Sequence, residues 1–122
     1  MTRALVIEDD ENNMVLIAAL LQKSGYQVSQ AWTGAEGVHM ALASRPDFII
    51  LDVRLPDLDG YEVLRQIRSS EIDGSIPIIA MTSYAMSGDR ERLLAAGCNG
   101  YLEKPIDAAQ VIAQIRHILA GR

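Results

Sequence analysis

Short apolar runs alternate with longer amphipathic segments along the whole chain. The runs are rich in valine, isoleucine and aromatic residues, which is typical of β-strands, and they cover residues 4–7, 26–31, 48–51, 76–81 and 100–102. The first, third and fourth runs are apolar without alternation, as expected for strands that are covered on both faces. The pattern therefore predicts five short strands, three of which lie in the interior.

The segments between the runs have the spacing of amphipathic helices. In the last segment Val111, Ile115 and Ile118 share one helical stripe. The helix after the third run is expected to begin at Asp57 or Asp59, because an aspartate oxygen can accept a free backbone N–H at a helix start. Repeated strand–helix units predict an α/β fold, namely a doubly wound five-stranded parallel sheet with five helices on its two faces.

Length and charge narrow the class of protein. The chain has 122 residues, a formal net charge of −5 and one cysteine, Cys98. A chain of this length is expected to form one domain, residues 1–122, that folds without a disulfide or a structural metal. The acidic balance argues against nucleic-acid binding, which needs clustered positive charge. No apolar run reaches 18 residues and no secretory signal is found, so we expect a cytoplasmic protein without a membrane span.

Polar residues follow the predicted strands at the edge where the carboxyl ends of parallel strands meet. Glu8 and Asp9 follow the first strand, and Asp52 follows the third. Thr82 and Lys104 follow the fourth and the fifth. In a doubly wound sheet the ligand site lies at this edge. Crowded carboxylates are unfavourable unless a cation lies among them, so the sequence predicts a Mg²⁺ site, with Mn²⁺ as an alternative ion.

Asp52 has the placement of a nucleophile. It follows a wholly apolar run, so its carboxylate leaves a buried strand with little rotational freedom. A carboxylate held beside a cation can attack phosphorus and form an aspartyl phosphate, since phosphoryl transfer needs mainly positioning and charge neutralisation. Mg²⁺ and Lys104 would supply the charge, and the Thr82 hydroxyl would donate a hydrogen bond to a phosphoryl oxygen.

Three other kinds of site are excluded because the sequence lacks residues that each of them needs. A calcium loop over residues 55–66 would need ligands at its first and twelfth positions, where Leu55 and Gln66 stand. No glycine-rich phosphate loop follows the first strand. A two-acid phosphatase needs a second acid two residues after the nucleophile, and Arg54 stands there. We therefore expect a phosphoryl acceptor and not a conventional turnover enzyme.

The strand-end residues lie in four motifs, which are Val6-Ile7-Glu8-Asp9-Asp10, Ile50-Leu51-Asp52-Val53-Arg54-Leu55-Pro56 with Asp59-Gly60, Met81-Thr82-Ser83, and Gly100-Tyr101-Leu102-Glu103-Lys104-Pro105. Together they resemble the receiver domain of two-component response regulators, the CheY-like superfamily, over essentially the whole chain. Residues 84–89 and the Glu8-Asp9 pair are similar to DivK-type single-domain regulators and to hybrid-kinase receiver domains. The resemblance implies the strand order 2-1-3-4-5.

The resemblance implies a role for each acid. Asp52 would accept a phosphoryl group from a phosphohistidine of a sensor histidine kinase or a histidine phosphotransfer protein. Asp9 and Asp52 would bind Mg²⁺ together with the backbone carbonyl of Arg54, and Glu8 would act through water. The chain would then be a phosphorylation-activated signalling switch.

The resemblance also implies how the switch is transmitted. Lys104 would pair with the phosphoryl group, Thr82 would hydrogen-bond it, and Tyr101 would move between exposed and buried rotamers. The Lys104–Pro105 peptide bond is expected to be cis. The face formed by residues 85–97, Tyr101 and residues 107–119 is expected to bind a downstream protein. We expect a monomer or a weak, phosphorylation-promoted dimer.

Two bulky side chains are expected to tune the phosphoryl lifetime. The resemblance implies that the positions two residues after the acceptor and two residues after Thr82 tune this lifetime; Arg54 and Tyr84 stand there, and we expect both to crowd the attacking water. Two alternatives stay open beside the switch. One is a phosphorylation-independent interaction module with the same fold, and the other is a receiver that belongs to a larger regulator or hybrid kinase.

Overall fold

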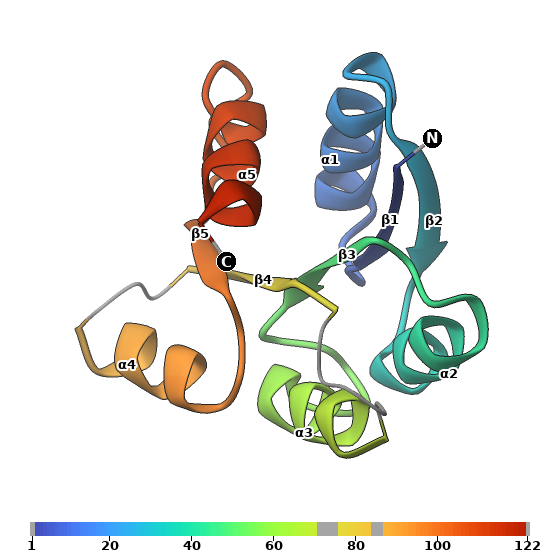
Figure 1. Cartoon of the computed structure of the whole chain (residues 1–122), viewed down its shortest axis with the longest axis vertical. Coiled ribbons are helices and arrows are strands. Elements are labelled where there is room, and N and C mark those ends of the chain that lie inside the picture. The colour runs from blue at the N-terminus through green and yellow to red at the C-terminus, as the bar shows by residue number, and fades with distance from the viewer. Residues whose placement is uncertain (1, 71–75, 84–86, 122) are drawn as a thin grey trace.

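The computed structural model describes residues 2–70, 76–83 and 87–121 as alternating strands and helices (Figure 1). The elements of these residues, in chain order, are β1 (Arg3–Ile7), α1 (Glu11–Lys23), β2 (Gln27–Ala31), α2 (Gly34–Ser44), β3 (Phe48–Asp52), α3 (Gly60–Ser70), β4 (Ile78–Thr82), α4 (Ser87–Ala95), β5 (Gly100–Glu103) and α5 (Val111–Ala120). The α/β alternation predicted from the apolar pattern is confirmed.

All neighbouring strands pair in parallel, in the order β2-β1-β3-β4-β5. This is the order that the family resemblance implied. The strands β3 and β4 are buried at every position and β1 at every position but its first, which explains why these three runs are apolar without alternation. The edge strand β2 is largely exposed and correspondingly polar.

The core consists of two layers, one on each face of the sheet. Helices α1 and α5 cover one face, and α2, α3 and α4 cover the other (Figure 1). Alternate residues of β3 serve the two layers: Phe48 and Ile50 pack toward α1 and α5, and Ile49 and Leu51 pack toward the other three helices. Cys98 is buried in the layer under α2, α3 and α4, as a small apolar residue would be.

Two strands begin later than the apolar pattern predicts, and both differences have a backbone cause. The N–H of Tyr26 donates to the carbonyl of Leu21 (3.0 Å) and closes the end of α1, where Gly25 has φ +96°, so β2 begins only at Gln27. Pro77 has no N–H to donate, so β4 begins at Ile78 and not at residue 76.

The carboxyl ends of β1, β3, β4 and β5 lie next to one another at one edge of the sheet, because the four strands are parallel neighbours. We call this the carboxyl edge and the opposite one the amino edge. The register places Asp52 beside Met81, and Thr82 beside Glu103, so β4 and β5 end level and β3 ends one position before them. Among the described helices none is long and apolar enough to span a membrane.

Candidate functional site

Three carboxylates meet at the carboxyl edge. Glu8 and Asp9 follow β1, and Asp52 ends β3; one oxygen of each lies within 4.8 Å of an oxygen of the others. Glu8 is fully buried and Asp52 is 3% exposed, whereas Asp9 is exposed. The backbone of Glu8 is fixed by its N–H, which donates to the carbonyl of Ala31 (3.0 Å). The fold therefore brings together the three acids that the sequence singled out.

One lysine faces the two buried acids. The Nζ atom of Lys104 lies 3.1 Å from Oε1 of Glu8 and 3.1 Å from Oδ1 of Asp52. Its backbone N–H donates to the carbonyl of Thr82 (2.9 Å), and the peptide bond to Pro105 is cis, as expected. The position of Lys104 beside Asp52 was predicted from the sequence, but its direct contact with Glu8 was not.

The electrostatics of these groups are those of an acidic site with too little positive charge. Burial, and after it the hydrogen bond and charge of Asp52, raise the pKa of Glu8 from 4.5 to about 7. Burial alone would lower the pKa of Lys104, but Asp52 and Glu8 outweigh it and raise that pKa above its usual value. Lys104 is ion-paired with two of the three clustered carboxylates, Glu8 and Asp52, so the ionised acids of the cluster outnumber the ammonium group that contacts them.

The donor set fits a hard divalent cation. Glu8 Oε1 is buried and, although it lies beside the Lys104 ammonium, it has no hydrogen-bond partner among the described residues. A buried carboxylate oxygen without a donor is costly, and a cation among carboxylate oxygens removes that cost. The Glu8, Asp9 and Asp52 oxygens are the ligand type that Mg²⁺ and Mn²⁺ prefer.

Arg54 and Thr82 border the cluster. The N–H of Arg54 donates to Oδ1 of Asp52 (3.2 Å), so the chain turns tightly around the carboxylate, and the Arg54 side chain is exposed. Thr82 ends β4, the strand next to β3, and is 5% exposed. Both therefore lie where the sequence placed them, on either side of Asp52.

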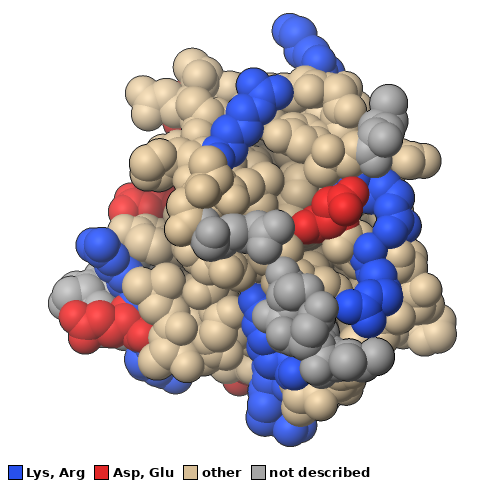
Figure 2. Space-filling model, viewed as in Figure 1, with Lys and Arg blue, Asp and Glu red and all other residues tan. Residues whose placement is uncertain are grey.

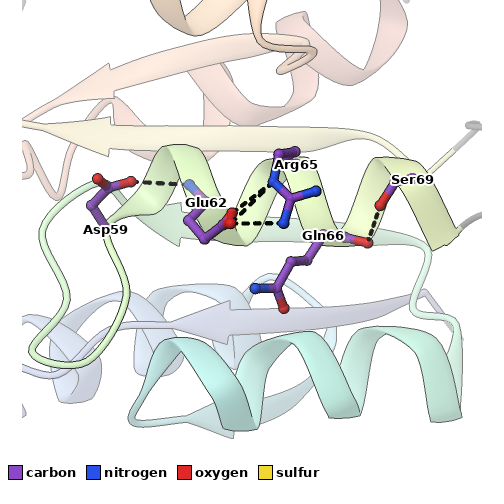
Figure 3. Close-up of polar contacts among 5 residues, drawn as sticks. All are labelled: Asp59, Glu62, Arg65, Gln66 and Ser69. Carbon is purple, nitrogen blue, oxygen red and sulfur yellow. Dashed lines mark hydrogen bonds and ion pairs between the residues drawn. The ribbon is translucent and has the colours of Figure 1, made fainter.

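Other nearby acids serve as helix caps. Asp10 accepts the N–H of Asn12 (3.0 Å) at the start of α1. Asp59 accepts the N–H of Glu62 (2.9 Å) at the start of α3, which decides between the two caps that the sequence allowed for this helix (Figure 3). Asp57 instead accepts backbone N–H groups of α2, from Gly34 (2.8 Å) and Ala35 (3.0 Å). This contact between elements was not predicted from the sequence.

The remaining predicted residues lie away from the acids or outside the described part of the chain. Tyr101 in β5 is half-buried, and the Arg90 guanidinium of α4 lies 5.6 Å from the centre of its ring. An open groove of about 800 Å³ runs between β5 and α5, lined among others by Tyr101, Asp107, Gln114 and His117. Tyr84 lies outside the described residues.

Comparisons with known proteins agree with this geometry. The model of the response regulator receiver domain family matches residues 4–116. The polar-differentiation response regulator DivK of Brucella anthropi is 37% identical over 115 residues, which are 94% of each chain, and that of Brucella ovis is 38% identical over the same share.

Two solved structures extend the comparison. The receiver domain of the Pseudomonas aeruginosa sensor histidine kinase PA1611 is 39% identical with a TM-score of 0.87, covers 98% of both chains, and has a magnesium ion coordinated in its active-site cleft. Vibrio cholerae CheY4 has a TM-score of 0.91 at 26% identity, covering 97% of this chain and 98% of its own.

Proposed function

This chain belongs to the response regulator receiver family, and we propose that Asp52 is the residue on which it accepts a phosphoryl group. As a member of this family it is a phosphorylation-activated signalling switch. The observation that carries the assignment is the setting of Asp52: a nearly buried carboxylate at the end of a central strand, 3.1 Å from Lys104 and clustered with Glu8 and Asp9.

The proposed step moves a phosphoryl group from nitrogen to oxygen. A carboxylate oxygen of Asp52 forms a bond to phosphorus while the P–N bond of a partner's phosphohistidine breaks, and the electron pair of that bond stays on the imidazole nitrogen. Lys104 is close enough to Asp52 to pair with the added phosphoryl oxygens. The Thr82 hydroxyl, at the end of the adjacent strand, donates to another of them.

We assign the metal to the same acids. Asp9 and Asp52 bind Mg²⁺ or Mn²⁺ with the carbonyl of Arg54, and Glu8 acts mainly through water. When bound, the cation supplies positive charge that offsets the carboxylates and the incoming phosphoryl group. The support is the clustering of three acids at the carboxyl edge and the buried Oε1 of Glu8, which lies beside the Lys104 ammonium but receives no hydrogen bond among the described residues.

The output of the switch is assigned to the face of α4, β5 and α5. Phosphorylation adds close to two negative charges, which draw Thr82 and Lys104 toward Asp52 and release space for Tyr101. Tyr101 lines the groove between β5 and α5, so its movement changes the surface that a downstream protein meets. Residues 1–122 then act as one cytoplasmic receiver domain, a monomer or a weak dimer that phosphorylation promotes.

The experiment is intact-protein mass spectrometry after incubation with acetyl phosphate, with Mg²⁺ or with EDTA, beside an Asp52→Asn variant. We expect a gain of one phosphoryl group that requires Mg²⁺ and is absent in Asp52→Asn. If the wild type gains nothing from acetyl phosphate or from a phosphohistidine donor, the proposal is wrong and the chain is a phosphorylation-independent interaction module.

A second experiment concerns the lifetime of the aspartyl phosphate. We propose that Arg54 and Tyr84 slow its hydrolysis by crowding the attacking water. Tyr84→Ala is then expected to lose its phosphoryl group faster than wild type, measured as the decay of the phosphorylated mass after the donor is removed. An unchanged decay would exclude Tyr84 from this role.

A further inference from the structure

The loop between β3 and α3, residues 53–59, is fixed at its two ends. At its start the N–H of Val53 donates to the carbonyl of Met81 (3.1 Å), and the carbonyl of Val53 accepts the N–H of Gly60 (2.7 Å). Only glycine fits at position 60, because a Cβ there would lie 2.6 Å from Cα of Val53. The chain therefore leaves Asp52 and returns to α3 through a narrow neck.

A third attachment holds the middle of this loop. Oδ1 of Asp57 accepts the N–H of Gly34 (2.8 Å) and Oδ2 accepts the N–H of Ala35 (3.0 Å), so both carboxylate oxygens bind the first turn of α2. These two donors, Ala35 first, hold the pKa of Asp57 below its usual range. A Cβ on Gly34 would lie 3.0 Å from Cβ of Leu58, so the loop and the helix start are in close contact.

The start of α2 does not need Asp57 in order to be capped. The hydroxyl of Thr33 accepts the N–H of Glu36 (3.1 Å), and Glu36 accepts the N–H of Trp32 (3.0 Å), which together form a local cap. The contact from Asp57 comes from 23 residues away in the sequence. Its distinctive effect is on the loop, which it ties to a second helix.

We propose that Asp57 is a positioning residue for the metal site: by tying the loop to α2, it fixes the backbone of Arg54, whose carbonyl the metal takes as a ligand. The inference rests on the proposed function, because the Arg54 carbonyl is a metal ligand only under that proposal. Arg54 lies between the neck and Asp57, and its N–H already donates to the Asp52 carboxylate. Leu55 and Leu58 of this loop also pack against the core. Without Asp57 the loop loses its hydrogen bonds to α2, and binding the cation must then order the backbone of Arg54 more fully.

The coupling is reciprocal, because two binding events that favour the same conformation strengthen each other equally. Bound Mg²⁺ that holds the Arg54 carbonyl also keeps Asp57 against α2. The N–H groups of Gly34 and Ala35 are then expected to exchange with solvent more slowly in Mg²⁺ than in EDTA. The N–H of Glu36, which donates to Thr33, serves as the internal reference because it does not contact the loop carboxylate.

The test compares Asp57→Ala with Thr33→Ala in the full chain, using calorimetric titration with Mg²⁺ alone. Both variants lose a cap on α2, but only the first releases the loop. We expect Asp57→Ala to weaken Mg²⁺ binding about fivefold or more, Asp57→Asn to fall between it and wild type because its amide has one acceptor oxygen, and Thr33→Ala to stay within about twofold of wild type.

The outcomes separate the two proposals. If wild type binds Mg²⁺ and Asp57→Ala and Thr33→Ala bind it equally well, the positioning role is wrong and the proposed function stands. If Mg²⁺ slows exchange at Gly34 and Ala35 no more than at Glu36, the positioning role is also wrong, and this measurement needs no variant to fold. If wild type binds no Mg²⁺, the metal assignment fails and the positioning role fails with it.

Discussion

The carboxyl and amino edges of the sheet both hold charged side chains out of full contact with water, but they neutralise them differently. At the amino edge the half-buried Arg68 donates to the carbonyl of Ile76 (2.7 Å), twice to that of Gly97 (2.8 and 3.1 Å) and to Oδ1 of Asn99 (3.1 Å). Asn99 in turn accepts the N–H of Ile78 (2.9 Å). This charge meets fixed hydrogen-bond acceptors, which are mostly backbone carbonyls.

At the carboxyl edge the balance is incomplete. Lys104 is ion-paired with Glu8 and Asp52, and Asp9 lies in the same acid cluster. Glu8 Oε1 receives no hydrogen bond among the described residues. The overall charge is −5, yet the view in Figure 2 shows more Lys and Arg than Asp and Glu on the face turned to the reader. The comparison of the two edges teaches that a buried charge indicates function when its partners do not satisfy it, and stability when they do.

Removing the ammonium group of the carboxyl edge should have the largest effect. Lys104→Met keeps an unbranched side chain but leaves Asp52 and its phosphoryl group without their nearby cation. We expect the rate of phosphoryl uptake from acetyl phosphate to fall about 100-fold at saturating Mg²⁺. The rate is read from the growth of the phosphorylated mass, with Arg68→Met as the amino-edge control. Equal rates in Lys104→Met and wild type would show that the Lys104 charge does not serve phosphoryl uptake, and would contradict the functional role given to the carboxyl edge.

The cost of the unbalanced acids should appear as a dependence of stability on pH. Because burial and Asp52 raise the pKa of Glu8 from 4.5 to about 7, the folded protein binds this proton more tightly than the unfolded chain does. The stability from this group is therefore complete below its unfolded pKa of 4.5 and is lost as the pH rises through about 7.

Glu8→Gln removes this titration. In EDTA we expect the variant to unfold with a free energy about 2 to 3 kcal/mol higher than wild type at pH 8, and with nearly the same free energy near pH 4.5. Urea unfolding of both proteins at the two pH values gives the difference. At pH 8, added Mg²⁺ should raise the free energy of unfolding of wild type more than that of Glu8→Gln. A difference that does not change with pH would contradict the raised pKa of Glu8.

At the amino edge the expected effect is on stability alone. Arg68→Met leaves the carbonyls of Ile76 and Gly97 without the guanidinium, and we expect it to lower the free energy of unfolding by about 2 kcal/mol. Arg65→Met, on the same helix, is the matched control: Arg65 is 65% exposed and pairs only with Glu62 among the contacts drawn in Figure 3, so its loss should change stability much less than the loss of Arg68 does.

Both arginine variants should take up the phosphoryl group with the Mg²⁺ dependence of wild type. Their uptake is measured under conditions where each is fully folded by circular dichroism. A folded Arg68→Met protein that lost uptake would show that the amino edge takes part in the chemistry, and a destabilisation equal to that of Arg65→Met would show that the backbone contacts of Arg68 do not matter.

The α/β alternation and the residues at the strand ends could be predicted because each depends on one local fact, whereas the strand order came from the family resemblance. Glu8, Asp52 and Thr82 each lie at the carboxyl end of an apolar run, and parallel neighbours bring such ends together. The edges of the runs were less certain: the Tyr26 N–H closes a helix instead of joining a strand.

The contacts of Asp57 and Arg68 could not be predicted in the same way. Asp57 binds amides of α2, and Arg68 binds carbonyls 8 and 29 residues away. Every residue has a backbone carbonyl and nearly every one an N–H, so the partner leaves no mark in the sequence. The choice of Asp59 over Asp57 as the cap of α3 was open for the same reason.

The most direct test of the central claim is to locate the phosphoryl group. The protein is phosphorylated with acetyl phosphate and Mg²⁺, reduced with borohydride, which converts an aspartyl phosphate to homoserine, and digested for peptide mass spectrometry. We predict homoserine at position 52 and at no other acid of the cluster. Homoserine at position 9, reduction of Glu8, or an unmodified Asp52 in a phosphorylated protein would contradict the account.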